Sequence, residues 1–168
     1  QPPIALDDLP EIDKVLISNN HYDHLDKASV KKLVAKTRQF LVPLGVETDL
    51  QKWDVPADKI IRFDWWQELK TDNALIAFTP TQHFSGRGIG DGNNTLWGSW
   101  VIKTTAGAIY FSGDSGYFDG FKQIGEKYGP FDIALIETGA YDNDWADIHM
   151  TPEQSVQAHL DVKGQVMV

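Results

Sequence analysis

A short apolar segment runs directly into a cluster of metal-ligating side chains near the start of this chain. Residues 15–17 (Val-Leu-Ile) predict a buried strand, and His21, Asp23 and His24 follow within a few residues. Because side chains alternate along a strand, these groups can face one object only if the backbone turns there. Neutral imidazole and carboxylate are ligands of zinc, iron and manganese. The pattern therefore predicts a metal-binding loop at the end of a strand.

The same stretch has a second interpretation as the cap of a helix. Asp26 stands directly before residues 27–36, which predict a helix with one apolar face, and an N-cap carboxylate accepts a backbone N–H of the first turn. A solvated capping loop would account for Asp26 without a metal. Imidazoles this dense at a strand end are uncommon, so metal binding is preferred for the cluster, with Asp26 as the helix cap.

Two more candidate ligands follow predicted strands later in the chain. His83 comes after the apolar residues 74–80, and Asp114 comes after residues 108–112, between two glycines that allow close approach to an ion. A hydrogen-bonded structural histidine and an ordinary turn aspartate are the alternatives. Strands separated by helices would gather these ends along one edge of a sheet. Together with the first cluster, this arrangement indicates one site.

Composition limits the class of protein. The 168 residues, 42% hydrophobic, suit one ordinary domain spanning 1–168, and a formal net charge of −9 argues against a nucleic-acid partner. The absence of cysteine excludes thiolate zinc sites and a disulfide scaffold but leaves a cytoplasmic or periplasmic location open. We find no apolar stretch near 18 residues, and so expect a soluble chain without a transmembrane segment. The start at Gln-Pro-Pro indicates that an upstream part is missing.

Three further features keep alternative interpretations. The glycines in residues 86–92 suggest a nucleotide-binding oxidoreductase, but no helix is expected after them, so a mobile loop beside the site is preferred. Trp65 and Trp66 pack in the core or form a substrate platform. His149 precedes Thr151 and Pro152, which predict a helix start, and it either packs in a loop or contacts a substrate anion.

The stretch Ser-Asn-Asn-His-Tyr-Asp-His-Leu-Asp resembles the His-x-His-x-Asp-His signature of the metallo-β-lactamase superfamily. It is most similar to the branch of N-acyl-phosphatidylethanolamine-hydrolysing phospholipase D, with the L-ascorbate-6-phosphate lactonases nearby. The segment Pro-Thr-Gln-His-Phe-Ser-Gly-Arg is similar to the same branch. The resemblance implies an α/β fold, the αββα sandwich with mixed sheets, of which this chain would cover the middle and be incomplete at both ends.

The resemblance also implies roles for residues. The first metal would be held by Asn19, His21, His83 and Asp114, and the second by Asp23, His24 and Asp114. Asp23 would orient or deprotonate the attacking water, and His149 would contact the substrate. The implied cofactor is one or two divalent ions, with zinc preferred and manganese or iron as alternatives.

Two functions follow from the resemblance. The first is a metal-dependent hydrolase, resembling a phosphodiesterase or phospholipase D, that acts on a small phosphorylated or lipid-like molecule. The second is a degenerate, truncated, non-catalytic member that binds a metal or a partner. The family's first histidine falls on Asn19, an amide is a weak zinc ligand, and the chain stops after Val168 before the family's last histidine. An exposed sheet edge in such a shortened chain predicts a homo-oligomer.

Overall fold

The computed structural model describes residues 4–139, 141–145 and 147–168, and for Asn143 the backbone alone. Residues 1–3, Ala140 and Ala146 lie outside the described residues. The chain divides into two compact units. The first unit comprises Gln1–Phe63 and Ser85–Leu96, and the second comprises Asp64–Phe84 and Trp97–Val168.

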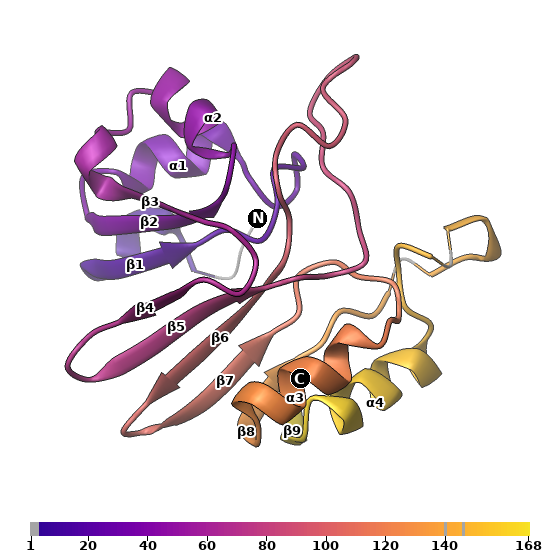
Figure 1. The fold of residues 1–168 in the computed structure, drawn as a ribbon. Coiled ribbons are helices and arrows are strands. Elements are labelled where there is room, and N and C mark those ends of the chain that lie inside the picture. Colours follow the sequence, from indigo (N-terminus) through magenta and orange to yellow (C-terminus); the bar gives the residue numbers. More distant parts are fainter. Residues whose placement is uncertain (1–3, 140, 146) are drawn as a thin grey trace. The chain divides into compact units, whose positions relative to one another are not determined.

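The first unit is a parallel three-stranded sheet, in the order β1-β2-β3, with its helices on one side (Figure 1). Each strand pair is joined through a helical connection, as parallel pairing requires. Its elements are η1 (Leu6–Asp8), β1 (Ile12–Leu16), α1 (Lys27–Leu33), β2 (Thr37–Pro43), α2 (Glu47–Lys52), η2 (Ala57–Lys59) and β3 (Ile60–Phe63).

Burial of the central strand organises the first unit. In β2, Phe40, Leu41 and Val42 have no exposed surface, as expected for the central strand of a parallel sheet. Leu50 of α2 and Val30 of α1 pack in the same core. Asp26 caps α1 as predicted, since its Oδ2 accepts the backbone N–H of Ser29 at 2.7 Å.

The second unit is a six-stranded mixed sheet in the order β4-β5-β6-β7-β8-β9 (Figure 1). The pairs from β4 to β7 are antiparallel, whereas β7-β8 and β8-β9 are parallel. Its elements are β4 (Glu68–Lys70), β5 (Ala74–Thr79), β6 (Ser99–Thr104), β7 (Gly107–Phe111), α3 (Gly120–Tyr128), β8 (Phe131–Leu135), η3 (Asn143–Trp145), α4 (Pro152–Asp161) and β9 (Gly164–Met167).

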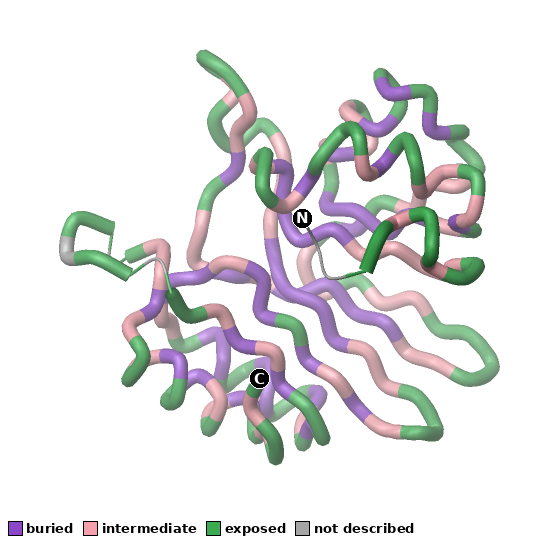
Figure 2. Tube along the Cα trace, turned by 180° about the vertical axis from the view of Figure 1, so that it is seen from behind, coloured by how far each residue is buried: buried purple, intermediate pink, exposed green. Residues whose placement is uncertain are grey.

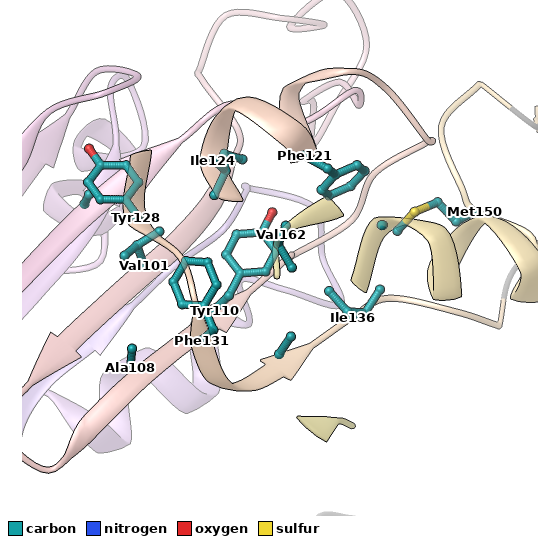
Figure 3. Packing of buried hydrophobic residues seen from close by; sticks show 13 residues of the cluster. Val101, Ala108, Tyr110, Phe121, Ile124, Tyr128, Phe131, Ile136, Met150 and Val162 are labelled. Carbon is teal, nitrogen blue, oxygen red and sulfur yellow. The ribbon is translucent and has the colours of Figure 1, made fainter. Parts of the chain in front are cut away.

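An aromatic core lies between this sheet and the neighbouring helices α3 and α4. The rings of Tyr110 and Phe131 lie side by side with centroids 5.5 Å apart, and Phe121 and Ile124 of α3 belong to the same cluster (Figure 3). Strand interiors are buried while the hairpin loops are exposed (Figure 2). The parallel pairs β7-β8 and β8-β9 are the ones whose connections contain α3 and α4.

The predicted α/β class with mixed sheets is confirmed. Thr151 caps the start of α4 at the predicted place and forms a capping box with Gln154. Trp66 packs partly buried against the core, while Trp65 donates its indole N–H to the carbonyl of Trp97 at 2.6 Å. The short strand β4 was not predicted, because Glu68–Lys70 carries two charges and no apolar run. Among the described residues, no helix combines the length and apolar character needed to cross a membrane.

Candidate metal centre

In the first unit, the chain turns at the predicted place. The carbonyl of His21 accepts the backbone N–H of Leu25 at 2.8 Å and that of His24 at 3.2 Å, so residues 21–25 form a single helical turn after β1. We call these residues the ligand turn. Successive side chains of such a turn point in different directions around it. His21, Asp23 and His24 therefore come from one compact turn, which lies where the backbone was predicted to turn.

The side chain of Asn19 is hydrogen-bonded to the backbone of the ligand turn. Its Oδ1 accepts the N–H of His21 at 2.9 Å, which closes an Asx turn, and its side-chain amide lies 3.5 Å from the hydroxyl of Ser18. Asn19 is buried, with 1% of its surface exposed. One lone pair of the oxygen that would face a metal is thus already engaged with the main chain.

Asp23 and His24 form a pair on the ligand turn. Their Oδ2 and Nε2 atoms lie 3.5 Å apart, with the side chain of Asp23 80% exposed and that of His24 25% exposed. An exposed carboxylate is accessible to water and small molecules. The two groups can share a cation or exchange a proton with solvent.

Arg87 contacts the ligand turn, although the sequence predicted only a loop beside the site for the segment that contains it. Its Nη1 donates to the carbonyls of Leu25 and Asn20 at 2.6 and 2.7 Å. Asp91 fixes the backbone around it by accepting the N–H groups of Arg87 and Gly88. Within the described residues 86–98 the chain forms turns and no helix, as expected, so this loop presents no helix N-terminus to a pyrophosphate.

In the second unit, an antiparallel bridge joins the segments that follow β5 and β7. Gly116 donates its N–H to the carbonyl of Gln82 at 2.8 Å, and Gln82 donates its own N–H to the hydroxyl of Ser115 at 3.0 Å. Gly113, with φ of +59°, allows the chain to leave β7 in a left-handed conformation. The bridge places His83 beside Asp114, although the two lie far apart in the sequence.

The hydrogen bonds of His83 define its tautomer. Its Nδ1 lies 3.1 Å from the carbonyl oxygen of Ile148, which can only accept, so Nδ1 carries a proton. In the neutral ring, Nε2 then carries a lone pair. That atom lies 3.5 Å from Oδ2 of Asp114, and both side chains are largely buried. Two lone-pair donors at this separation suit a shared cation.

His149 belongs to the same group in the second unit. Its ring lies edge-on to that of His83 with centroids 5.3 Å apart, and its Nδ1 lies 2.9 Å from Oε1 of Glu137. Glu137 also accepts the backbone N–H of Met150 and, through its own main chain, contacts the hydroxyls of Ser112 and Ser155. Glu137 was not predicted as a site residue, although it follows β8 as the other candidates follow their strands.

Two carboxylates near the ligand turn have altered acidity. Hydrogen bonds from the hydroxyl and backbone N–H of Ser29 hold the pKa of Asp26 below its usual range. The backbone N–H groups of Gly88 and Arg87 lower the pKa of Asp91 in the same way. Both groups therefore stay ionised well into acid, which keeps these hydrogen bonds in their charge-assisted form at neutral pH.

The structure brings the predicted site residues together in two groups, one in each unit. Three of them, His21, Asp23 and His24, lie in the ligand turn, and Asn19 lies two residues before it. The second unit brings together His83, Asp114 and His149. Each group contains both imidazole and carboxylate, the mixed donor set of zinc and related divalent ions.

Comparison with known proteins is consistent with this chemistry. A protein of Mycobacterium tuberculosis without an assigned function is 49% identical over 162 residues, covering 96% of this chain and 43% of the relative. N-acyl-phosphatidylethanolamine-hydrolyzing phospholipase D 1 of Caenorhabditis elegans is 35% identical over 176 residues, covering 98% of this chain and 49% of the relative. The chain thus spans less than half the length of these two relatives.

A solved structure shares the fold. Igni18, a metallo hydrolase from the archaeon Ignicoccus hospitalis, superimposes with a TM-score of 0.73 at 24% identity, covering 94% of this chain and 62% of that one. The predicted metallo-β-lactamase fold is confirmed by this shared fold taken together with the family match. The beta-lactamase superfamily domain matches residues 1–168, and the chain belongs to that family.

Proposed function

We propose that this chain carries the metal-binding core of a metal-dependent hydrolase and that the bond it cleaves is a phosphodiester in a lipid-like or small phosphorylated molecule. Support for the reaction class comes from the family and from donor chemistry in both units. The substrate class is supported by the phospholipase D relative, whose name states hydrolysis of a phospholipid.

The observation that carries the proposal is the pairing of His83 with Asp114. The carbonyl oxygen of Ile148 accepts the Nδ1 proton of His83. The Nε2 atom of the same ring, which carries the lone pair, lies 3.5 Å from a carboxylate oxygen of Asp114. This is the way metal-binding histidines are oriented, with the second ring nitrogen tied to a carbonyl or carboxylate. The residues present therefore fit a divalent cation.

The proposed ligand sets follow the family roles. The first ion would be held by Asn19, His21, His83 and Asp114, and the second by Asp23, His24 and Asp114. Such ions supply a Lewis acid for a phosphoryl oxygen and lower the pKa of bound water toward about 7. Zinc matches the imidazole-rich donors, and manganese or iron would also be accommodated by the carboxylates.

Asp23 and His149 would act on the reactants. The exposed carboxylate of Asp23 would accept a proton from, or orient, the attacking water. Glu137 accepts the Nδ1 proton of His149, so that ring would donate from Nε2 to a phosphoryl oxygen of the substrate as an imidazolium ion, with Glu137 balancing its charge.

A second function, non-catalytic binding of a metal or partner, has one observation in its favour. The Oδ1 of Asn19 accepts the backbone N–H of His21, so this residue serves the loop in addition to any role toward a metal. An amide oxygen is also a weaker zinc donor than imidazole. Under this alternative, the chain would bind zinc but would not hydrolyse a substrate.

Metal content and turnover of the chain test these functions together. Hydrolysis of bis(p-nitrophenyl) phosphate should disappear on chelation, return with zinc, and fall by about a hundredfold or more in Asp114→Asn, since that carboxylate is proposed to serve both ions. Asp119→Asn is the matched control, because this carboxylate lies on the surface of the same unit with 87% of its side chain exposed.

The outcomes separate the candidates. Zinc binding with turnover supports the hydrolase, and zinc binding without turnover supports the non-catalytic member. Equal zinc uptake by the wild type and Asp114→Asn would refute the ligand assignment. Vesicles containing N-acyl-phosphatidylethanolamine, compared with a soluble short-chain phosphodiester, then distinguish a lipid-like from a small phosphorylated substrate.

A further inference from the structure

Arg87 spans both ends of the ligand turn. Its Nη1 lies 2.7 Å from the carbonyl oxygen of Asn20, which precedes the turn, and 2.6 Å from that of Leu25, which ends it. The same nitrogen lies 3.5 Å from the carbonyl of His21. Charge-assisted hydrogen bonds of this length are among the stronger ones in proteins. One side chain thus fixes the start and the end of the segment that carries His21, Asp23 and His24.

Aromatic rings hold the guanidinium of Arg87 in place. Its Cζ lies 4.2 Å from the ring centroid of Tyr22, a residue of the ligand turn, and 5.0 Å from that of Trp53 at the end of α2. A planar guanidinium stacks on such rings while donating at its edge, which an ammonium cannot reproduce. The contact therefore depends on arginine and not on positive charge alone.

The backbone on either side of Arg87 is anchored as well. Gly86 donates its N–H to Oδ1 of Asn20 at 2.9 Å, and the N–H of Arg87 lies 3.0 Å from Oδ2 of Asp91. Gly88 donates to the other oxygen of Asp91 at 2.9 Å. The side chain therefore projects from a fixed base, and the ligand turn is held by both the side chain and the main chain of this loop.

We propose that Arg87 is a positioning residue for the metal ligands of the first unit, acting through the backbone carbonyls of the ligand turn. The proposal rests on the proposed function, because it assumes that His21 and His24 bind an ion. A cation beside a metal site opposes binding by charge repulsion, so the benefit of Arg87 must come from geometry. Without it, the carbonyls of Asn20 and Leu25 lose their donor and the turn can relax.

The expected effect is a loss of metal affinity in a folded protein. Changing partners that orient metal ligands costs about 10- to 100-fold in affinity, and we expect Arg87→Met and Arg87→Lys to fall in that range. Methionine keeps an unbranched apolar stem, and lysine keeps the charge. If charge were the relevant property, Arg87→Lys would retain wild-type affinity and Arg87→Met would bind a divalent cation more tightly.

The experiment measures zinc dissociation constants by chelator competition, together with the visible spectrum of the protein saturated with cobalt. The matched control is Arg38→Met, since Arg38 lies in the same unit and its side chain is 79% exposed. A third variant, Arg87→Ala, is titrated with free guanidinium, which can occupy the vacated position between the rings. Urea unfolding of each variant without metal identifies any that fail to fold.

Three results support the proposal: at least tenfold weaker zinc binding in folded Arg87→Lys, an altered cobalt spectrum, and recovery of affinity by guanidinium in Arg87→Ala. Affinity within threefold of the wild type in Arg87→Lys and Arg87→Met overturns it. So does a loss of affinity that appears only in variants unfolded without metal. Failure of the wild type itself to bind zinc would instead refute the proposed function.

Discussion

The two groups of candidate ligands are built in different ways. In the first unit, His21, Asp23 and His24 come from one continuous turn, and its shape is set by hydrogen bonds within a few residues plus the contacts of Arg87. In the second unit, His83 and Asp114 come from segments that follow different strands and meet only through the bridge between Gln82 and Gly116.

This difference determines how substitutions in each group affect stability and metal binding. A local turn can be perturbed without unfolding the sheet that carries it, because its hydrogen bonds lie within the turn and with Arg87, outside the strands. The second group depends on close packing of several segments, including the approach of residue 147 to Gly116 and of Ile148 to His83. Substitutions there should cost stability as well as metal affinity.

The largest expected effect is at Gly116. A Cβ at this position would lie 2.1 Å from the backbone oxygen of Asp147, so Gly116→Ala must push two main-chain segments apart. We expect a loss of about 3 kcal/mol in the free energy of unfolding, at the upper end for overpacking. Urea denaturation measures it.

Gly92 provides the matched control in the first unit, because a Cβ there would meet nothing within 4 Å. Gly92→Ala should change the free energy of unfolding by less than about 0.5 kcal/mol. Equal effects of the two substitutions would contradict the proposed difference between a packed group and a local turn.

Glu137 is the next test of the second group. Glu137→Ala removes the acceptor of His149 Nδ1 and of the N–H of Met150, and each partner is partly or fully buried. We expect about 2 kcal/mol of destabilisation, within the range for leaving buried donors without an acceptor. Glu137→Gln keeps an acceptor and should lose less. If both variants unfold at the wild-type urea concentration, Glu137 does not support the group.

The sequence predicted the first group far better than the second. A local turn is encoded by neighbouring residues, so the strand, the turn after it and the cap of Asp26 could all be inferred from spacing. His83 and Asp114 were found as residues at strand ends, but their tautomer and pairing depend on Ile148 and a bridge between distant segments.

The residues that were not predicted from the sequence were missed for a common reason. Arg87 and Glu137 act on groups distant in the chain, so although Glu137 follows a strand as the other candidates do, no local pattern shows which group either side chain contacts. The strand β4 was missed because its pairing with β5, and not an apolar run, makes it a strand. Long-range contacts of this kind leave no periodic signal in one sequence.

Substitutions at Asn19 test whether the first group of ligands can be made to bind zinc more tightly. An imidazole at this position would add a strong donor, and Asn19→His is expected to strengthen zinc binding about tenfold, at the low end of the range for changes to a metal's surroundings. The gain is limited because Asn19 also accepts the N–H of His21. Asn19→Ala separates the two effects, since it removes the hydrogen bond without adding a ligand. An unchanged zinc dissociation constant in Asn19→His would show that this side chain does not face the ion.

The smallest expected effects are at the helix caps, which offer one comparison in each unit. Asp26→Ala at α1 and Thr151→Ala at α4 each remove a side chain that accepts a first-turn N–H, from Ser29 and Gln154 respectively. Each should cost about 1 kcal/mol in the free energy of unfolding. Only the Asp26 cap should depend on pH, because a threonine hydroxyl does not titrate in this range.

The sign of that dependence follows from the lowered pKa of Asp26, which hydrogen bonds from Ser29 hold below its usual range in the folded state. The unfolded chain takes up this proton first, so the stabilisation is present above about pH 4 and is lost as pH falls through the folded value. Asp26→Asn retains a capping side chain that cannot ionise. The stability difference between the wild type and Asp26→Asn should therefore be constant at neutral pH and shrink below about pH 4. A difference that stays constant down to pH 2 would mean that the charge of Asp26 contributes nothing to the cap.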